Sequence, residues 1–365
     1  MKDKIVYMLG AGCSASYGYP LAKSFRDALR EYGDTLGQQP NCERLRQCVT
    51  KTVTLMEKYQ SPTVDRLVLQ IVEELERQRR PLGVFYTKRH NELENAEQEQ
   101  ILDAKRATTA FFLEREAKAR KTGLQGYRDF LNIIFEGDRD PRVLRSTTRR
   151  VLSFNYDRLF EIAFADYFRL DSGVDCYGQA WLNSSLDFLD RRAVDVVPAR
   201  FSFLKLHGTA GIFVAEQHGV PRYSCVALHN SNFTIDDNLF WPANRKPLSH
   251  REIAEPLIVF PFEKDRARSG GTSFLFDSYI RAIWGQPEQQ GYAEKLVQEA
   301  RQIWVVGYSF DPNDRKPMID LLRKSAGSPI VIRNRTKEEA QGICEELGLT
   351  YGDLAPRLKP FAKPF

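Results

Sequence analysis

Glycine-rich and polar segments recur in this 365-residue chain directly after short apolar runs, and the first of them is suited to binding phosphate. It follows the apolar run at residues 4–9. Glycines let backbone amides approach a pyrophosphate closely, and a serine hydroxyl adds a hydrogen-bond donor. A tight turn between a strand and a helix requires glycine as well, so the motif alone is weak. The candidate dinucleotide-binding residues are Gly10, Ala11, Gly12 and Ser14.

Two further segments carry side chains that can move protons or orient a substrate. Asn155 and Asp157 follow the apolar run at residues 150–154, and His207 follows the run at residues 203–206. An amide both donates and accepts hydrogen bonds, and a histidine titrates near neutral pH. Asn155 and Asp157 can also cap the next helix, and a histidine after a strand is often structural. The three residues are candidate catalytic groups, with these structural alternatives open.

Two late segments complete the pattern. Gly307 and Ser309 follow the apolar run at residues 303–306, and Asn334 follows the run at residues 330–332. If the runs are parallel strands, their carboxyl ends lie at one edge of a sheet, where open α/β proteins bind ligands. All five segments then face one crevice. That convergence favours a ligand-binding site over five unrelated turns and caps.

The elements that position these segments predict an α/β fold with a Rossmann-like, doubly wound parallel sheet, because short apolar strands alternate with helical patterns. Residues 170–200 and 210–255 are irregular and rich in aromatic residues, Asn, Asp and Pro, and are expected to form irregular loops or a minor subdomain over the sheet edge. Helices are expected after Pro20 and at residues 158–168 and 317–325. Strands are expected at residues 4–9, 150–154, 203–206, 257–260, 303–306 and 330–332.

A large helical insertion interrupts the α/β pattern. Apolar residues recur with helical spacing over residues 64–75, and residues 91–120 form a longer, more polar helical stretch. We therefore expect a helical insertion subdomain at residues 41–144. The Rossmann-like domain would then comprise residues 1–40 and 145–365. The polar outer helices of the insertion are expected to be exposed or to form an oligomer interface.

The composition excludes several classes of protein. With 42% hydrophobic and 28% charged residues, the chain is expected to fold as a globular protein. No run approaches the ~20 apolar residues of a membrane span, and no signal peptide is recognisable, which predicts a cytoplasmic protein that binds no membrane. None of the six cysteines forms a Cys-x-x-Cys pair, so no metal is expected. The net charge of +5 is mild, and direct nucleic-acid binding is not expected.

The order of these segments resembles the motif order of sirtuins, the silent information regulator family. Residues 10–20 resemble the opening glycine motif, and residues 153–157 resemble the Asn-x-Asp motif. Residues 206–208 resemble the catalytic histidine segment. Residues 307–309 resemble the second glycine–serine motif, and residues 331–334 resemble the strand whose Asn holds the adenosine ribose. The resemblance spans almost the whole chain and implies that the ligand is NAD⁺.

The chain also departs from sirtuin deacylases. It has no four-cysteine zinc module, and the Ile-Pro-Asp-Phe-Arg continuation of the glycine motif is reduced to Tyr19-Pro20-Leu21. Together with the helical insertion, these features resemble the divergent bacterial sirtuin-like proteins that degrade NAD⁺ in anti-phage defence. The resemblance implies an NAD⁺ hydrolase (NADase) that acts as an antiviral defence effector. It also implies a homo-oligomer and, as in some members of that group, a HerA-like ATPase partner.

Cleavage of the nicotinamide–ribose bond passes through an oxocarbenium-like transition state, and the cationic leaving group needs no strong acid. His207 is the expected base, and Asn155 is expected to orient the attacking water and the ribose. By resemblance, Asp157 binds the nicotinamide carboxamide or the ribose. Asn334 is expected to hold the adenosine ribose. The diphosphate is expected to contact Gly10, Ala11, Gly12 and Ser14, with Gly307 and Ser309 nearby.

The expected activity is that of an NAD⁺ glycohydrolase that releases nicotinamide and ADP-ribose. Two alternatives stay open: an NAD-dependent protein deacylase, and a non-catalytic, nucleotide-sensing scaffold subunit. A deacylase needs a peptide groove, and without the zinc module that groove lacks its usual second wall. A scaffold has no need of Asn155, Asp157 and His207 together. Because unrestrained loss of NAD⁺ is toxic, activity is expected to depend on assembly or on a trigger.

Overall fold

The computed structural model describes most of the chain. Two predicted ligand-binding residues, Ser309 and Asn334, lie outside the described residues, and so does the predicted loop region at residues 170–200. The described residues are 4–79, 87–169, 201–217, 220–226, 233–241, 255–268, 277–286, 289–308, 310, 316–325, 327–333 and 336–352.

Five parallel strands form the central sheet, in the order β10-β9-β1-β2-β3. After its first residue, each of β1, β2 and β9 is buried throughout, as expected for strands that are covered on both faces. The predicted α/β fold with a Rossmann-like parallel sheet is therefore confirmed. The strands are β1 (Ile5–Leu9), β2 (Arg149–Ser153), β3 (Ser202–Lys205), β9 (Gln302–Val306) and β10 (Ile330–Ile332).

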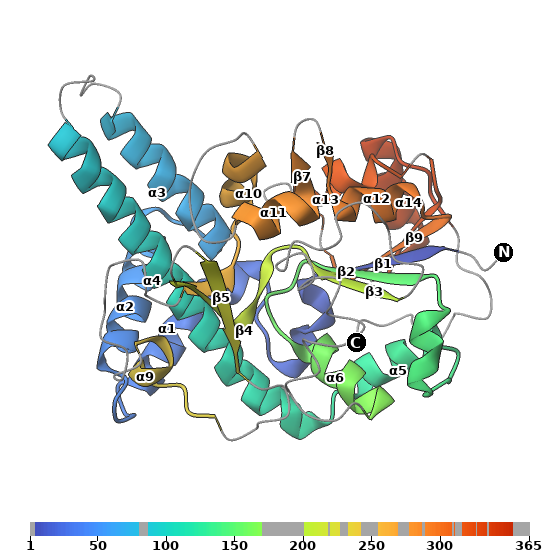
Figure 1. Cartoon of the computed structure of the whole chain (residues 1–365), viewed down its shortest axis with the longest axis horizontal. Helices are drawn as coiled ribbons and strands as arrows, with labels where there is room; N and C mark the ends of the chain where they lie inside the picture. The colour runs from blue at the N-terminus through green and yellow to red at the C-terminus, as the bar shows by residue number, and fades with distance from the viewer. Residues whose placement is uncertain are drawn as a thin grey trace.

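Helices lie on both faces of this sheet (Figure 1). On one side are α5 (Gln125–Ile134) and α6 (Leu159–Phe168), and on the other are α12 (Tyr292–Gln298), α13 (Lys316–Leu322) and α14 (Lys337–Leu347). The chain runs from β1 through β2 to β3 and then returns to β9 and β10 on the other side of β1. The winding direction therefore reverses between β1 and β9. Open α/β sheets bind their ligands at such a switch point.

A second, antiparallel sheet follows β3, in the order β5-β4-β6. The prediction that residues 257–260 form a strand of the parallel sheet is wrong, because β6 pairs with β4 instead. The prediction of irregular structure at residues 210–255 is wrong for β4 and β5. The link from β3 to β4 is too short for the crossover that parallel strands require, so β4 does not continue the parallel sheet. The strands are β4 (Gly208–Gln217), β5 (Val220–Cys225) and β6 (Glu255–Ile258).

Four helices form most of the helical region, namely α1 (Phe25–Leu36), α2 (Glu43–Lys58), α3 (Val64–Arg79) and α4 (Thr87–Ala119). The helices predicted at residues 64–75 and 91–120 are confirmed by α3 and α4, which pack along each other as the long hairpin of Figure 1. The apolar stripe of α1 is buried with α2 and α4, and α4 also contacts β4 and β6. The division of the chain into residues 41–144 and the remainder stays a prediction.

Two buried apolar clusters account for the packing. One surrounds the parallel sheet, and the other joins α1–α4 to residues of the second sheet such as Phe213 and Ile258. Within the described ranges, no helix has both the length and the apolar character needed to cross a membrane. The shorter elements are η5 (Arg120–Thr122), η6 (Pro141–Arg145), α9 (Asp237–Phe240), α10 (Pro261–Arg268), α11 (Asp277–Trp284), β7 (Gly285–Gln286) and β8 (Gln289–Gln290).

Candidate active site

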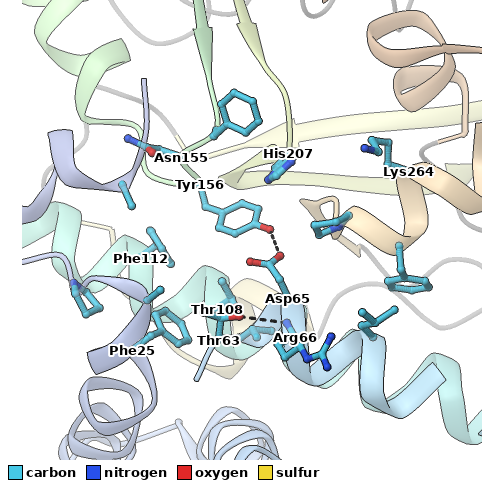
Figure 2. Close-up of a pocket in the computed structure, with 18 of the residues that line it drawn as sticks. Phe25, Thr63, Asp65, Arg66, Thr108, Phe112, Asn155, Tyr156, His207 and Lys264 are labelled. Carbon is cyan, nitrogen blue, oxygen red and sulfur yellow. Dashed lines mark hydrogen bonds between the residues drawn. The ribbon is translucent and has the colours of Figure 1, made fainter. Parts of the chain in front are cut away.

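A cavity of about 760 Å³ lies at the carboxyl edge of the parallel sheet. This volume falls within the roughly 300–1,000 Å³ of small-molecule sites. The opposite side of the cavity consists mainly of residues from α3, α4 and α10 (Figure 2). On the sheet side, the cavity brings together five of the predicted site residues, namely Ala11, Ser14, Asn155, Asp157 and His207.

The glycines of the first and last motifs pack the turns after β1 and β9 against each other. The Gly12 amide donates to the Gly307 carbonyl at 2.7 Å, and the Gly10 amide donates to the Val306 carbonyl at 2.9 Å. A Cβ atom at Gly10 or Gly12 would lie 2.7 or 2.8 Å from the Gly307 carbonyl oxygen. Gly307 has a φ of +66°, and a side chain there would also overlap Cys13. These glycines are therefore required to join the two turns.

The amides of the first turn are largely committed within the protein. Besides those of Gly10 and Gly12, the Cys13 amide donates to the Gly10 carbonyl at 3.0 Å, and the Ser14 amide donates to the Ala11 carbonyl at 3.1 Å. In the described part of the chain, the Ala11 amide is the one amide of this segment that has no acceptor. The turn therefore offers an anion one backbone amide, that of Ala11.

No helix longer than one turn begins at this segment of the described structure. Three 3-10 helices follow β1, at Ala11–Cys13, Ala15–Tyr17 and Ala22–Ser24, and α1 starts after them. Gly18, with a φ of +84°, and Pro20 interrupt the helical conformation. The helix predicted after Pro20 is confirmed by α1, which begins too far along the chain to place its N-terminus at the glycine turn.

A buried hydrogen-bond network joins Ser14 to the segment after β2. The Ser14 hydroxyl donates to Asp157 Oδ2 at 2.7 Å and lies 2.9 Å from the Tyr127 hydroxyl. The Leu159 amide, at the start of α6, donates to Asp157 Oδ1 at 3.1 Å. Asp157 is 4% exposed, and burial raises the pKa of its carboxyl group. Asp157 thus binds the first amide of α6 and orients Ser14 at the edge of the cavity.

Asn155 and His207 present unpartnered polar atoms at the cavity. The Asn155 side-chain nitrogen donates to the Ser14 hydroxyl at 3.5 Å, whereas Asn155 Oδ1 has no partner among the described residues. His207 Nε2 likewise has no hydrogen-bond partner within the described ranges. Buried polar atoms of folded proteins are almost always hydrogen-bonded, so these two atoms are candidates for contacts with a ligand. Figure 2 shows both side chains on the sheet side of the cavity.

His207 is enclosed by aromatic rings. Its ring centroid lies 5.4 Å from that of Phe154, 6.1 Å from that of Tyr156 and 6.2 Å from that of Trp284. Burial, and after it the positive charge of Lys264, lowers the pKa of His207 to about 3. The prediction that His207 titrates near neutral pH is therefore wrong. A neutral imidazole keeps one nitrogen that accepts a hydrogen bond, so His207 is suited to accept one from a hydroxyl group.

Tyr156 connects the sheet side of the cavity to the insertion. Its hydroxyl donates to Asp65 Oδ1 at 2.7 Å, and its backbone carbonyl accepts from the Ala210 amide at 2.8 Å. Figure 2 shows the Tyr156 ring between His207 and the helix that carries Asp65. Nothing in the sequence marks Asp65 as a site residue, because acidic residues are common in the first turn of a helix.

Lys264 of α10 also lines the cavity and is 4% exposed. Its ammonium group lies 4.6 Å from the centre of the Trp284 ring, and Trp284 Nε1 donates to the Leu206 carbonyl at 2.9 Å. Trp284 therefore contacts both the lysine and the strand end that carries His207. The sequence gives no signal for Lys264, because charged residues occur along most of α10.

Two buried ion pairs connect α4 to elements that carry site residues. Arg158 Nε and Nη2 each lie 2.8 Å from a carboxylate oxygen of Glu116. Burial opposes ionisation of Glu116, but the charges and hydrogen bonds of Arg158 and Arg120 together outweigh it and lower the pKa of that carboxyl group. In the second pair, Lys105 Nζ of α4 lies 2.7 Å from the carboxylate of Glu263, which precedes Lys264 in α10. The position of the insertion relative to the sheet depends on these contacts.

Within the described residues, no three His, Cys, Asp or Glu side chains gather as a metal site requires. No protein-family model matches the sequence, and no curated protein matches it at a significant level. The chemistry of the cavity is therefore the basis for a functional assignment.

Proposed function

We propose that this chain is a sirtuin-like NAD⁺ glycohydrolase, which cleaves the nicotinamide–ribose bond and releases nicotinamide and ADP-ribose. The observation that carries the proposal is the pair of atoms without partners in the described structure, Asn155 Oδ1 and His207 Nε2, whose side chains line one cavity at the carboxyl edge of the sheet. The motif order along the chain supplies the identity of the substrate.

In the proposed reaction, the bond between C1′ of the ribose and N1 of nicotinamide breaks, and its electron pair neutralises the pyridinium nitrogen. A water oxygen bonds to C1′, and the water gives up one proton. His207 accepts a hydrogen bond from a ribose hydroxyl or from this water. Asn155, whose side-chain nitrogen is held on Ser14, presents its oxygen to the water or the ribose. These contacts stabilise the positive charge that develops on the ribose.

The low pKa of His207 defines how it contributes. A histidine with a pKa of about 3 is a weak base, so it acts mainly by accepting a hydrogen bond while the proton passes on to solvent. The imidazole of the free enzyme stays neutral across the pH range in which ordinary histidines titrate, about pH 5 to 8. The rate of nicotinamide release is therefore expected to show no titration of His207 in that range.

The remaining predicted residues complete the proposed substrate site. Ala11 and Ser14 line the cavity, and Asp157 keeps Ser14 in place. The contacts of Ser309 and Asn334 with the adenosine half are proposed on the motif resemblance alone. The same holds for the homo-oligomer, the HerA-like ATPase partner and the NAD⁺-depleting role in anti-phage defence.

The proposal is tested by incubating the purified protein with NAD⁺ and measuring nicotinamide, with and without an acetylated peptide. We expect nicotinamide release without the peptide. Release that requires the peptide would indicate a deacylase. Binding of NAD⁺ without any release would indicate a nucleotide-sensing subunit.

Asn155→Ala and His207→Ala are each expected to lower nicotinamide release about a hundredfold or more, because each removes a polar group from the reacting centre. Asn132→Ala is the matched control, since Asn132 belongs to α5 and does not line the cavity. Circular dichroism and thermal unfolding check that the variants fold. Undiminished release by both site variants would contradict the assignment.

A further inference from the structure

The diphosphate of NAD⁺ carries two negative charges, and the turn after β1 offers them little compensation. The amides of Gly10, Gly12, Cys13 and Ser14 donate within the protein, which leaves that of Ala11. The Ser14 hydroxyl already donates to a carboxylate oxygen. A diphosphate bound at this turn alone would therefore keep most of its charge uncompensated.

Cationic side chains line the cavity from elements outside the predicted motifs. In the described structure they are Arg66 of α3, Lys264 of α10 and Lys316 of α13. Arg66 and Lys316 are exposed, and Lys316 forms an ion pair with Asp320 at 2.5 Å. Lys264 is the buried one of the three. A charge that is shielded from bulk water interacts more strongly with an anion than an exposed charge does.

Lys264 is held in position from two sides. The Trp284 ring lies 4.6 Å from its ammonium group. The preceding residue, Glu263, pairs with Lys105 of α4 at 2.7 Å and accepts a hydrogen bond from the Phe260 amide at 2.9 Å. A buried side chain that packs on a ring and extends from an anchored helix loses little conformational entropy when it binds an anion. Figure 2 shows the Lys264 side chain extending toward His207.

We propose that Lys264 binds the phosphate that is attached to the nicotinamide ribose. This inference rests on the proposed function. The phosphate is bonded to the C5′ oxygen of the ribose, a few bonds from C1′. A cation beside His207 therefore lies within reach of this phosphate when His207 contacts the ribose. The contribution of the Lys264 charge to the lowered pKa of His207, second to burial, supports the closeness of the two groups.

The test is the affinity for ADP-ribose, measured by calorimetry for the wild type, Lys264→Met and Lys316→Met. Loss of a charge-assisted hydrogen bond is expected to weaken binding to Lys264→Met about tenfold or more. Lys316→Met is the matched control, because it also removes a cavity-lining lysine, and it is expected to bind as the wild type does. Nicotinamide riboside, which carries no phosphate, is expected to bind equally to the wild type and to Lys264→Met.

Two further variants guard against a folding defect. Lys264→Gln removes the charge but keeps a polar side chain, and it is expected to lose affinity for ADP-ribose as Lys264→Met does. Lys264→Arg keeps the charge and is expected to retain most of the affinity. Equal affinity of the wild type and both charge-removing variants for ADP-ribose overturns the inference. An equal loss of affinity for nicotinamide riboside, or a wild type that binds no ADP-ribose, overturns it as well.

Binding of ADP-ribose requires no turnover, so this inference and the proposed function fail separately. A wild type that binds ADP-ribose through Lys264 but releases no nicotinamide overturns the proposed function alone. Nicotinamide release by the wild type, with unchanged affinity of the Lys264 variants for ADP-ribose, overturns the inference alone.

Discussion

The two walls of the cavity are held by different kinds of interaction. The sheet wall extends from strands such as β1 and β9, whose residues are mostly apolar and buried, and from backbone hydrogen bonds between the turns that follow them. The insertion wall shares a buried apolar cluster with the second sheet, and it is connected to the rest of the site by buried charged pairs in addition, Arg158 with Glu116 and Lys105 with Glu263. Apolar packing tolerates conservative changes, whereas breaking a buried ion pair is strongly destabilising. Single substitutions should therefore disturb the insertion more readily than the sheet.

The largest effect on stability is expected from breaking one of these connections. Glu116→Leu leaves Arg158, whose side chain is 0% exposed, without its carboxylate, and this should lower the free energy of unfolding by about 3–5 kcal/mol. Arg30→Ala is the control, because it breaks an exposed pair with Glu57, and exposed pairs contribute little to stability. Urea unfolding measures both variants. A loss from Glu116→Leu as small as that from Arg30→Ala would show that α4 is held by other contacts.

A second, smaller effect is expected on the pH dependence of the free energy of unfolding, through His207 on the sheet wall. The pKa of His207 is about 3 in the folded protein, against the ordinary 6.5. The unfolded chain therefore binds more protons as the pH falls below about 6.5, and stability that is present above this pH is lost on acidification. Between pH 7 and pH 5, His207 alone should cost on the order of 2 kcal/mol.

The matched variant for this effect is His207→Phe, which keeps an aromatic ring but cannot titrate. Burial raises the pKa of Glu161 to about 7, which gives a contribution of opposite sign, but Glu161 titrates in both proteins and cancels in the comparison. Unfolding free energies at pH 7 and pH 5 should fall further for the wild type than for His207→Phe. Equal losses would contradict a buried, neutral histidine on the sheet wall.

The smallest effect is expected from the hydrogen bond that joins the walls inside the cavity. Tyr156→Phe removes the hydroxyl that donates to Asp65, and the segment that carries Asn155 is then less well positioned. We expect kcat for nicotinamide release to fall about tenfold, with a smaller change in KM. Tyr59→Phe is the matched control. The Tyr59 hydroxyl donates to Glu74, which belongs to α3 as Asp65 does but does not line the cavity. Equal kinetics of the two variants would mean that α3 does not position the site.

The sheet wall could be predicted from the sequence because each of its residues is marked by its immediate neighbours. Asn155 and His207 both follow short apolar runs, and such runs form the buried strands β2 and β3. The sheet to which a strand belongs is not marked in this way. Residues 255–258 do form a strand, but it pairs with β4 in the second sheet and not with the parallel strands.

The side of the cavity formed by α3, α4 and α10 could not be predicted, because its contributions depend on contacts between distant segments. Asp65 becomes a site residue only through a hydrogen bond to Tyr156, 91 positions along the chain. Lys264 becomes a site residue only because Trp284 contacts it and also donates a hydrogen bond to Leu206, next to His207. The pKa of His207 is likewise set by burial among rings from separate elements.

The central claim, that Asn155 and His207 act together on the nicotinamide–ribose bond of NAD⁺, is tested most directly by a time course. NAD⁺, nicotinamide and ADP-ribose are measured with the purified protein and with His207→Ala. The wild type should release nicotinamide and ADP-ribose in equal amounts as NAD⁺ disappears, and His207→Ala should release neither at a comparable rate. No product from the wild type, or equal rates from both proteins, would contradict the claim.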